Sequence, residues 1–336
     1  MRRLTIPDGY RPSLNLVETE RAIKHCKDLF ESELAALLKL TRVSAPLFVL
    51  PQTGLNDNLN GVERPVSFDI ADMEGTRCEV VHSLAKWKRQ ALHRYGFAQG
   101  EGLYTDMNAI RRDEEMDNLH SIYVDQWDWE VILSAQERTR CRLHRTVEDI
   151  YTVFLSVEAQ LKERWPQLTK KLPERIHFIT AEQLMERFPD LTPAQREDAA
   201  AREWGAVFIE GIGAPLSNGK PHDGRAPDYD DWTLNGDIVF YYPLLDRAFE
   251  VSSMGIRVDA AALRAQCEAN GCPERLALPF HRQVLSGELP LTMGGGIGQS
   301  RICMYLLDKA HIGEVQASIW PQDQAACCAE HHIALL

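Results

Sequence analysis

The sequence has no run of about 18 apolar residues, so it predicts no helix that crosses a membrane. Two arginines near its start, in MRRLTIPDGYRPSLN, are not followed by an apolar stretch, which argues against a secretory signal. Basic residues are scarce as well: 37 Lys and Arg stand against 49 Asp and Glu, a formal net charge of −12 at pH 7. Such a charge disfavours broad binding to nucleic acid or to an anionic membrane, so we expect neither as a partner.

Cysteines are few and scattered, eight among 336 residues, and no C-x-x-C motif occurs. Apart from the adjacent Cys327 and Cys328, Cys267 and Cys272 form the closest pair, but no second pair of Cys or His lies near them in the sequence, so we expect no structural zinc site. Scattered thiols in a chain of this length are typical of the reducing cytosol, and we expect a cytoplasmic protein. No internal repeat and no linker rich in Gly and Pro is visible, which favours a single domain over residues 1–336.

Helical and extended patterns alternate along the chain and predict an α+β fold. Phe30, Leu34 and Leu37, for example, recur at helical spacing. Because several long strands follow one another directly, we expect a mainly antiparallel sheet flanked by helices. The predicted helices cover residues 14–40, 84–95, 137–163, 181–203, 260–270, 279–286 and 299–308. The predicted strands cover residues 65–70, 78–82, 102–111, 120–130, 206–212, 236–243 and 248–258.

One predicted strand, SIYVDQWDWE, mixes polar and large apolar side chains. Strand alternation places Gln126, Asp128 and Glu130 on one face, and Trp127 and Trp129 on the other. The pattern is typical of a sheet floor under a polar ligand, and a solvated face is the alternative.

Arginines at the ends of elements indicate an anion site. The strand in LYTDMNAIRRDEE ends on Arg111 and Arg112, which could clamp a phosphate or a carboxylate; a charged hairpin is the alternative. GGGIGQSR precedes a helix, where glycines allow close approach of a phosphate, although the spacing fits neither a P-loop nor a Rossmann motif. Arg301 in the first helical turn is unfavourable unless an anion or a carboxylate accompanies it; the alternative is a glycine-rich turn.

Acidic and basic residues gather near other predicted strand ends. Asp230 and Asp231 in RAPDYDDW, Asp237 in LNGD and Glu250 could hold Mg²⁺ against nucleotide phosphates. The alternative is that at least one of Asp230 and Asp231 only forms a turn. In HSLAKWKRQ, Lys88 stands where a substrate carboxylate could reach it, although a solvated basic face is the more common explanation.

Together these segments resemble the aspartate–ammonia ligase family, the ammonia-dependent asparagine synthetases. The resemblance rests on HSLAKWKRQ, EGLYTDMNAIRRDE, YVDQWDWE, RAPDYDDW, LNGD, SSMGIRVD and GGGIGQSR, spread over most of the chain. It implies the catalytic fold of class II aminoacyl-tRNA synthetases. It also implies ATP as a substrate, Mg²⁺, and a homodimer formed through the first helix and the segment up to Pro46. Residues 1–12 and the tail from about residue 321 match no motif of the family and are expected to be peripheral.

The resemblance also implies a reaction and a set of site residues. L-Aspartate, ammonia and ATP would give L-asparagine, AMP and diphosphate through a β-aspartyl-adenylate. Aspartate would be held by Asp57, Ser83, Lys88, Gln126, Asp128 and Ser253. The nucleotide would be held by Arg111, Asp230, Asp237, Glu250, Ser252, Arg257, Gly296 and Arg301. Asp237 and Glu250 would face Mg²⁺, and the catalytic set would be Asp57, Arg111, Gln126 and Arg301.

Two features qualify this assignment. Plain strand alternation would put Glu250 and Ser253 on opposite faces, so we expect a bulge or bend within residues 252–255, for which Gly255 is suitable. The stretch between Trp232 and Asn235 is shorter than the family's flexible loop. Two alternatives remain: an aspartyl- or asparaginyl-tRNA synthetase, which normally needs an anticodon-reading domain, and a non-catalytic regulatory paralogue, which would not need the charged residues.

Overall fold

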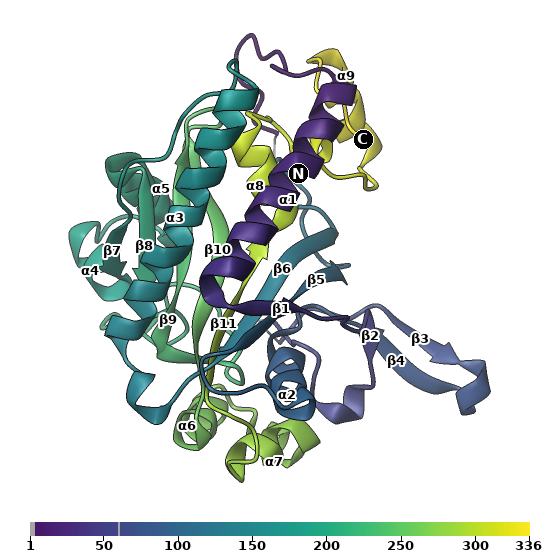
Figure 1. Ribbon diagram of the computed structural model, residues 1–336, viewed down its shortest axis with the longest axis vertical. Coiled ribbons are helices and arrows are strands. Elements are labelled where there is room, and N and C mark those ends of the chain that lie inside the picture. Colours follow the sequence, from purple (N-terminus) through teal and green to yellow (C-terminus); the bar gives the residue numbers. More distant parts are fainter. Residues whose placement is uncertain (1–3, 60) are drawn as a thin grey trace.

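The computed structural model describes residues 4–59 and 61–336, and its centre is a large mixed sheet (Figure 1). This eight-stranded sheet has the order β1-β5-β6-β11-β10-β9-β8-β7. The outermost pairs, β1 with β5 and β7 with β8, are parallel, and the pairs between them are antiparallel. Its strands are β1 (Leu40–Arg42), β5 (Gly102–Ile110), β6 (Tyr123–Ile132), β7 (His177–Thr180), β8 (Ala206–Glu210), β9 (Asp230–Tyr242), β10 (Arg247–Arg257) and β11 (Thr292–Gly298).

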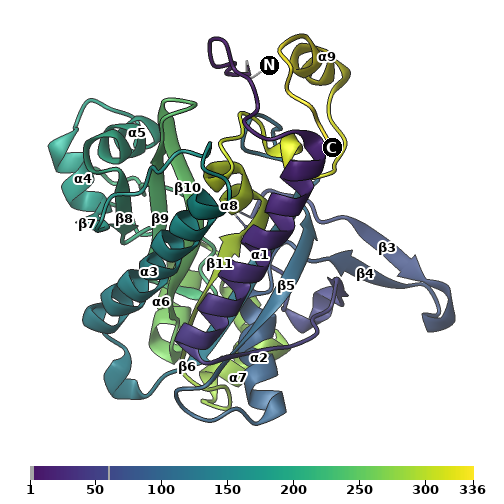
Figure 2. The same ribbon diagram turned by 45° about the horizontal axis from the view of Figure 1, so that its top comes forward.

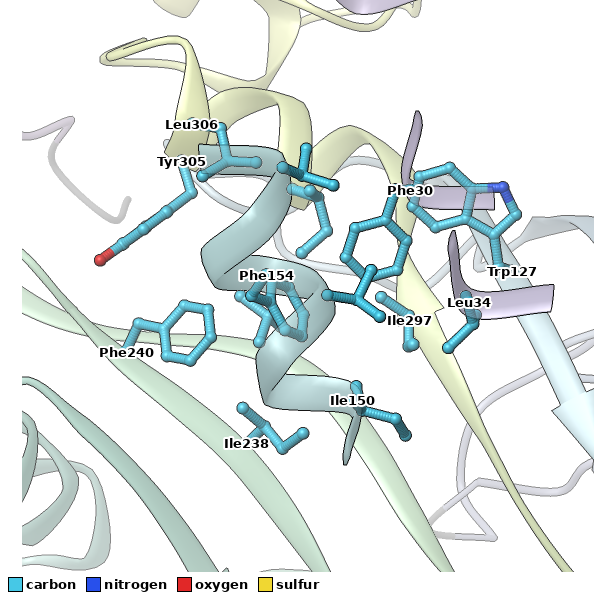
Figure 3. Packing of buried hydrophobic residues seen from close by; sticks show 14 of the residues in the cluster. Phe30, Leu34, Trp127, Ile150, Phe154, Ile238, Phe240, Ile297, Tyr305 and Leu306 are labelled. Carbon is cyan, nitrogen blue, oxygen red and sulfur yellow. The ribbon is translucent and has the colours of Figure 1, made fainter. Parts of the chain in front are cut away.

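Two long helices, α1 (Leu16–Leu38) and α3 (Arg140–Arg164), lie side by side across one face of this sheet (Figures 1 and 2). The main hydrophobic core lies between them and the strands. Phe30 of α1 stacks on Trp127 of β6 with 4.8 Å between ring centroids, and Phe154 of α3 packs edge-on against Phe30 and Phe240 (Figure 3). With this face closed by aromatic packing, the opposite face of the central strands is left for a site.

Shorter helices complete the structure. They are α2 (Ala85–Tyr95), α4 (Ala181–Arg187), α5 (Pro193–Trp204), α6 (Ala260–Ala269), α7 (Pro279–Leu285), α8 (Gln299–Leu306) and α9 (Gln322–Glu330). A small three-stranded sheet of β2 (Phe48–Val49), β4 (Thr76–Val80) and β3 (Ser67–Ile70) projects from one side of the molecule (Figures 1 and 2). Described segments near the two ends of the chain pack together: Tyr10 shares a small core with Cys328 and Ile333.

Most predicted elements are present, but several expectations were wrong. The main sheet is mainly antiparallel, as expected, but its short outer strands β1 and β7 were not predicted, and each runs parallel to its neighbour. The predicted helix over 181–203 is two helices, because Thr192 caps a new helix that begins at Pro193. The glycine-rich segment before Arg301 is strand β11 rather than a turn, held between β6 and β10.

Candidate active site

A cavity of about 380 Å³ opens on the face of the sheet opposite α1 and α3. It is lined by β6, β9, β10 and β11 together with the segments around Asp57, Ser83 and Arg111. All of the site residues predicted from the sequence line this one cavity: Asp57, Ser83, Lys88, Arg111, Gln126, Asp128, Asp230, Asp237, Glu250, Ser252, Ser253, Arg257, Gly296 and Arg301. The structure therefore brings together residues that lie up to 244 positions apart in the chain.

Lys88 lies in the wall of the cavity, where α2 packs against the sheet. Its Nζ atom donates a hydrogen bond to the Gly295 carbonyl at 2.9 Å and lies 3.5 Å from a carboxylate oxygen of Asp128. Burial lowers the pKa of Lys88, and the Asp128 carboxylate opposes that shift. Asp128 thus neutralises the ammonium charge of Lys88 only in part, and this cation beside the cavity is suited to binding an anionic ligand.

Strand alternation places the polar side chains of β6 as expected. Gln126 and Asp128 line the cavity, while Trp127 and Trp129 are buried in the core on the other face. Gly296 of β11 is paired with Asp128, and a Cβ at this position would lie 2.4 Å from Oε1 of Gln126 and 2.7 Å from Oδ1 of Asp128. Position 296 therefore requires a residue without a side chain if Gln126 and Asp128 are to keep their observed positions.

Asp57 and Ser83 come from two loops that are tied together. The Asp57 carboxylate accepts hydrogen bonds from the Ser83 hydroxyl and from the backbone N–H of Leu59, each at 2.8 Å. The Asn56 side-chain oxygen accepts from the backbone N–H of His82 at 2.9 Å. These bonds fix a buried carboxylate at the wall of the cavity.

Arg257 is engaged with buried carboxylates beside the cavity. Its Nε and Nη2 atoms donate to Glu130, and Nη1 donates to Asp230. Burial alone would raise the pKa of Glu130, but the Arg257 guanidinium, together with Lys88 and Thr292, outweighs burial and holds that pKa below its ordinary value. The turn interpretation of Asp230 and Asp231 was wrong: both begin β9, and Asp231 pairs with Arg138.

Asp237 and Glu250 face the cavity from inside β9 and β10, and not from strand ends as expected. Glu250 pairs with Val239 and Ser252 pairs with Ile238, so Val251 is an additional residue in β10. This bulge brings Glu250 and Ser253 to the same face, as predicted, although it begins one residue before the expected segment. Burial raises the pKa of Glu250, and the nearby Asp237 carboxylate raises it further.

Each of these two carboxylates lies beside an arginine. Arg301, in the first turn of α8, donates to the Glu250 backbone carbonyl at 2.8 Å and lies 3.6 Å from its carboxylate. Arg225 donates to both carboxylate oxygens of Asp237 at 2.7 Å. Arg225 was not predicted as a site residue from the sequence, although it is the first residue of the RAPDYDDW segment.

Arg111 follows directly after β5 at the rim of the cavity. Its backbone N–H donates to the Ile122 carbonyl at 2.8 Å, which fixes the turn between β5 and β6. Its Nε atom has no hydrogen-bond partner among the described residues. Residues 232–235 lie within the continuous strand β9, and residues 223–226 of the connection before it line the cavity.

The fold is that of a class II aminoacyl-tRNA synthetase catalytic core. The *Entamoeba histolytica* asparaginyl-tRNA synthetase solved with asparaginyl-adenylate superposes with a TM-score of 0.66, covering 90 % of this chain and 66 % of that protein at 14 % identity. The *Pyrococcus horikoshii* asparaginyl-tRNA synthetase with asparaginyl-adenylate gives 0.66 over 90 % of this chain and 70 % of its own, also at 14 % identity. The *Entamoeba histolytica* aspartyl-tRNA synthetase gives 0.62, and this chain spans 57 % of it.

Sequence relatives are much nearer and match end to end. The aspartate–ammonia ligase of *Ruminiclostridium cellulolyticum* is 63 % identical over 336 residues, and that of *Limosilactobacillus reuteri* is 58 % identical over 334, each with at least 99 % of both chains covered. The profile of the aspartate–ammonia ligase family matches residues 17–332. The chain therefore belongs to the aspartate–ammonia ligase family. It is an ATP-dependent ligase that forms asparagine from aspartate and ammonia.

Proposed function

We propose that the protein works through a β-aspartyl-adenylate and releases AMP and diphosphate. The observation that supports this proposal is the cavity, which gathers a cationic amine, carboxylates and arginines around one space. Lys88, Gln126 and Asp128 would hold aspartate together with Asp57, Ser83 and Ser253. The remaining residues, Arg111, Asp230, Asp237, Glu250, Ser252, Arg257, Gly296 and Arg301, would hold the nucleotide.

Two bond exchanges complete the reaction. The side-chain carboxylate of aspartate attacks the α-phosphorus of ATP, a new P–O bond forms, and the bond to diphosphate breaks. Ammonia then attacks the β-carbonyl carbon, a C–N bond forms, the nitrogen loses one proton to solvent, and AMP leaves with the electrons of the C–O bond. Arg111 and Arg301 stabilise the charge that develops on the phosphates, while Lys88 and its neighbours orient aspartate.

Magnesium belongs to the same proposal. Among the described residues no group of three or more His, Cys, Asp and Glu side chains is placed to hold a metal ion. Asp237 and Glu250, however, both line the cavity, and Mg²⁺ is commonly bound by one or two carboxylates with phosphates completing its shell. The ion would neutralise phosphate charge while these carboxylates hold it.

We also propose a cytoplasmic homodimer in which the chain forms one catalytic domain with peripheral ends. Helix α1, the element expected to form the dimer, leaves Leu16 and Val17 more than half exposed, which supports burial against a second copy. No helix among residues 4–59 and 61–336 is long and apolar enough to cross a membrane. Sedimentation of the purified protein at twice the monomer mass is the expected result.

The deciding experiment is product identification with purified protein, aspartate, ammonium and Mg·ATP. AMP and diphosphate should form in step with asparagine, whereas ADP and phosphate would contradict attack at the α-phosphorus. Glutamine in ammonia-free buffer should give essentially no asparagine. Release of ammonia from glutamine requires a nucleophilic thiol, and no cysteine is among the residues that line the cavity. Attachment of aspartate or asparagine to a tRNA would favour the alternative of an aspartyl- or asparaginyl-tRNA synthetase.

A further inference from the structure

Some arginines that line the cavity have no role predicted from the sequence. Arg225 is the most deeply buried of these. Its Nη2 atom donates to both carboxylate oxygens of Asp237 at 2.7 Å, and its Nη1 atom donates to the Ser253 hydroxyl at 2.5 Å. Its side chain is 11 % exposed and lines the cavity. Asp237 and Ser253 are directly paired across β9 and β10, so one guanidinium spans both strands.

The surroundings of Arg225 are acidic. Burial would lower its pKa, but its acidic neighbours, Asp237 first among them and Asp230 with it, together outweigh burial and raise it. Asp223 and Glu250 also face this cluster, and burial raises the pKa of each before the repulsion from Asp237 is added. Arg225 is therefore a permanent cation that balances a carboxylate cluster which would otherwise repel itself.

The present pairing does not satisfy the whole guanidinium. The Nε atom of Arg225 is buried and has no hydrogen-bond partner among the described residues. A buried donor without a partner costs about 1–3 kcal/mol, so a second arrangement that satisfies Nε could be close in energy. Arg225 is also on the connection between β8 and β9, outside the sheet that holds Asp237 and Ser253.

Both carboxylates proposed to face Mg²⁺ thus lie beside an arginine, Asp237 beside Arg225 and Glu250 beside Arg301. A guanidinium that donates to both oxygens of Asp237 repels a divalent ion and competes with it for this carboxylate. The nucleotide that accompanies the ion, however, brings phosphate oxygens that match the guanidinium fork. Charge then stays balanced if the carboxylate passes to the ion and the arginine passes to a phosphate.

We propose that Arg225 is a further phosphate-binding residue, which occupies Asp237 until the metal–nucleotide complex binds and then exchanges that carboxylate for a phosphate of the nucleotide. The inference rests on the proposed function, because it takes the metal and nucleotide roles of Asp237 from it. It makes Arg225 a competitor of the free metal ion and a partner of the nucleotide. No bond other than hydrogen bonds and metal contacts changes in this exchange.

The substitution Arg225→Gln should change metal binding and nucleotide binding in opposite directions. Without nucleotide, Mn²⁺ measured by electron paramagnetic resonance should bind the variant about tenfold more tightly than the wild type, because its competitor is gone. With Mg²⁺ present, the β,γ-imido analogue of ATP should bind about tenfold or more weakly, since a charge-assisted phosphate contact is lost. Either an unchanged Mn²⁺ affinity or an unchanged analogue affinity would overturn the proposal.

A matched control is Arg140→Gln. Arg140 also makes a two-pronged contact with a carboxylate, at 2.8 and 3.0 Å from Glu210, but it does not line the cavity. Neither binding constant should change in this variant. If Arg225→Gln does not fold, Arg225→Lys replaces it: Mn²⁺ affinity should stay near the wild-type value while the analogue binds more weakly, because a lysine keeps the charge but not the fork. Equal binding of the analogue by Arg225→Lys and wild type would then overturn the proposal.

Two further measurements separate the possible failures. Wild-type protein should exchange labelled diphosphate into ATP only when aspartate is present; if it does not, the proposed adenylate fails whatever Arg225 does. If that exchange is normal and Arg225→Gln raises the KM for aspartate while leaving Mn²⁺ binding unchanged, Arg225 is a contact for the amino acid. That result would overturn the exchange and leave the proposed function standing.

Discussion

The carboxylate of Glu130 accepts hydrogen bonds from Nε and Nη2 of Arg257, at 3.0 and 2.7 Å, where both side chains are buried beside the cavity. The hydroxyl of Thr292 donates to the same carboxylate at 2.7 Å. This contact joins β6, β10 and β11, the central strands of the site. Its removal should therefore affect the stability of the fold as well as the shape of the cavity.

Glu130→Gln should lower the free energy of unfolding by about 3 kcal/mol or more, because it leaves the buried Arg257 charge with Asp230 as its remaining bonded carboxylate. Urea unfolding measures this change. The exposed pair of Lys24 and Asp28 provides the control, since Asp28→Asn should change stability by no more than about 0.5 kcal/mol. Equal effects of the two substitutions would contradict the structural role of Glu130.

The same pair predicts a dependence on pH. Burial would raise the folded-state pKa of Glu130, but Arg257, with Lys88 and Thr292, outweighs burial and depresses it. The ionised carboxylate therefore contributes stability that is present above its unfolded pKa of about 4.3 and is lost as the pH falls through the lower folded pKa. The stability difference between wild type and Glu130→Gln should be constant near neutrality and shrink in acid. A difference that grows as the pH falls below 4 would show the opposite sign of the shift.

Arg111→Ala and Arg301→Ala should each lower kcat by about 10²–10³, roughly 3–4 kcal/mol, if each guanidinium stabilises phosphate charge in the transition state. Thermal unfolding should show that both variants remain folded. Arg140→Ala, which removes an arginine outside the cavity, serves as the control and should keep its activity. A near-wild-type rate for Arg111→Ala or Arg301→Ala would show that its role was assigned wrongly.

Gly296→Ala should lower kcat/KM for aspartate by about 10², because the new methyl group would displace Gln126 and Asp128. Steady-state kinetics with aspartate as the varied substrate measures the effect. Gly271→Ala is the comparison: its Cβ would meet open space, so backbone strain at φ +67° should reduce stability slightly without changing KM. Unchanged aspartate kinetics in Gly296→Ala would mean that aspartate is held elsewhere.

Asp57→Asn tests whether this carboxylate attracts ammonium. The substitution keeps the shape and removes the charge, so the KM for ammonium should rise about tenfold or more while that for ATP changes little. Asparagine formation with each substrate varied in turn provides the comparison. If only the KM for aspartate rises, Asp57 contacts the amino acid and does not capture ammonium.

Local patterns were enough for much of this protein. Period-two alternation correctly separated Gln126 and Asp128 from Trp127 and Trp129, because neighbouring side chains of a strand always point to opposite faces. The need for a bulge between Glu250 and Ser253 followed from alternation together with the family resemblance, which assigned both residues to the site. The family resemblance then named residues that all line one cavity, although their individual roles remain predictions.

Other features depend on partners that are distant in the sequence. Asp230 and Asp231 have the composition of a turn, yet they are strand residues, because Arg257 and Arg138 from other elements compensate their buried charges. The glycines before Arg301 can adopt either a turn or a strand conformation. They form strand β11 because they pair with the neighbouring strands β6 and β10.

By itself, then, the sequence determined the family, the type of most elements and the membership of the site, since these follow from short motifs and local periodicity. Tertiary structure alone decided which charges meet. The contact of Arg225 with Asp237 crosses 12 positions, and its contact with Ser253 crosses 28. Such a pairing cannot be predicted from the sequence, because Coulomb energy depends on distance in space and on burial. Both quantities are set only when β9 and β10 have paired.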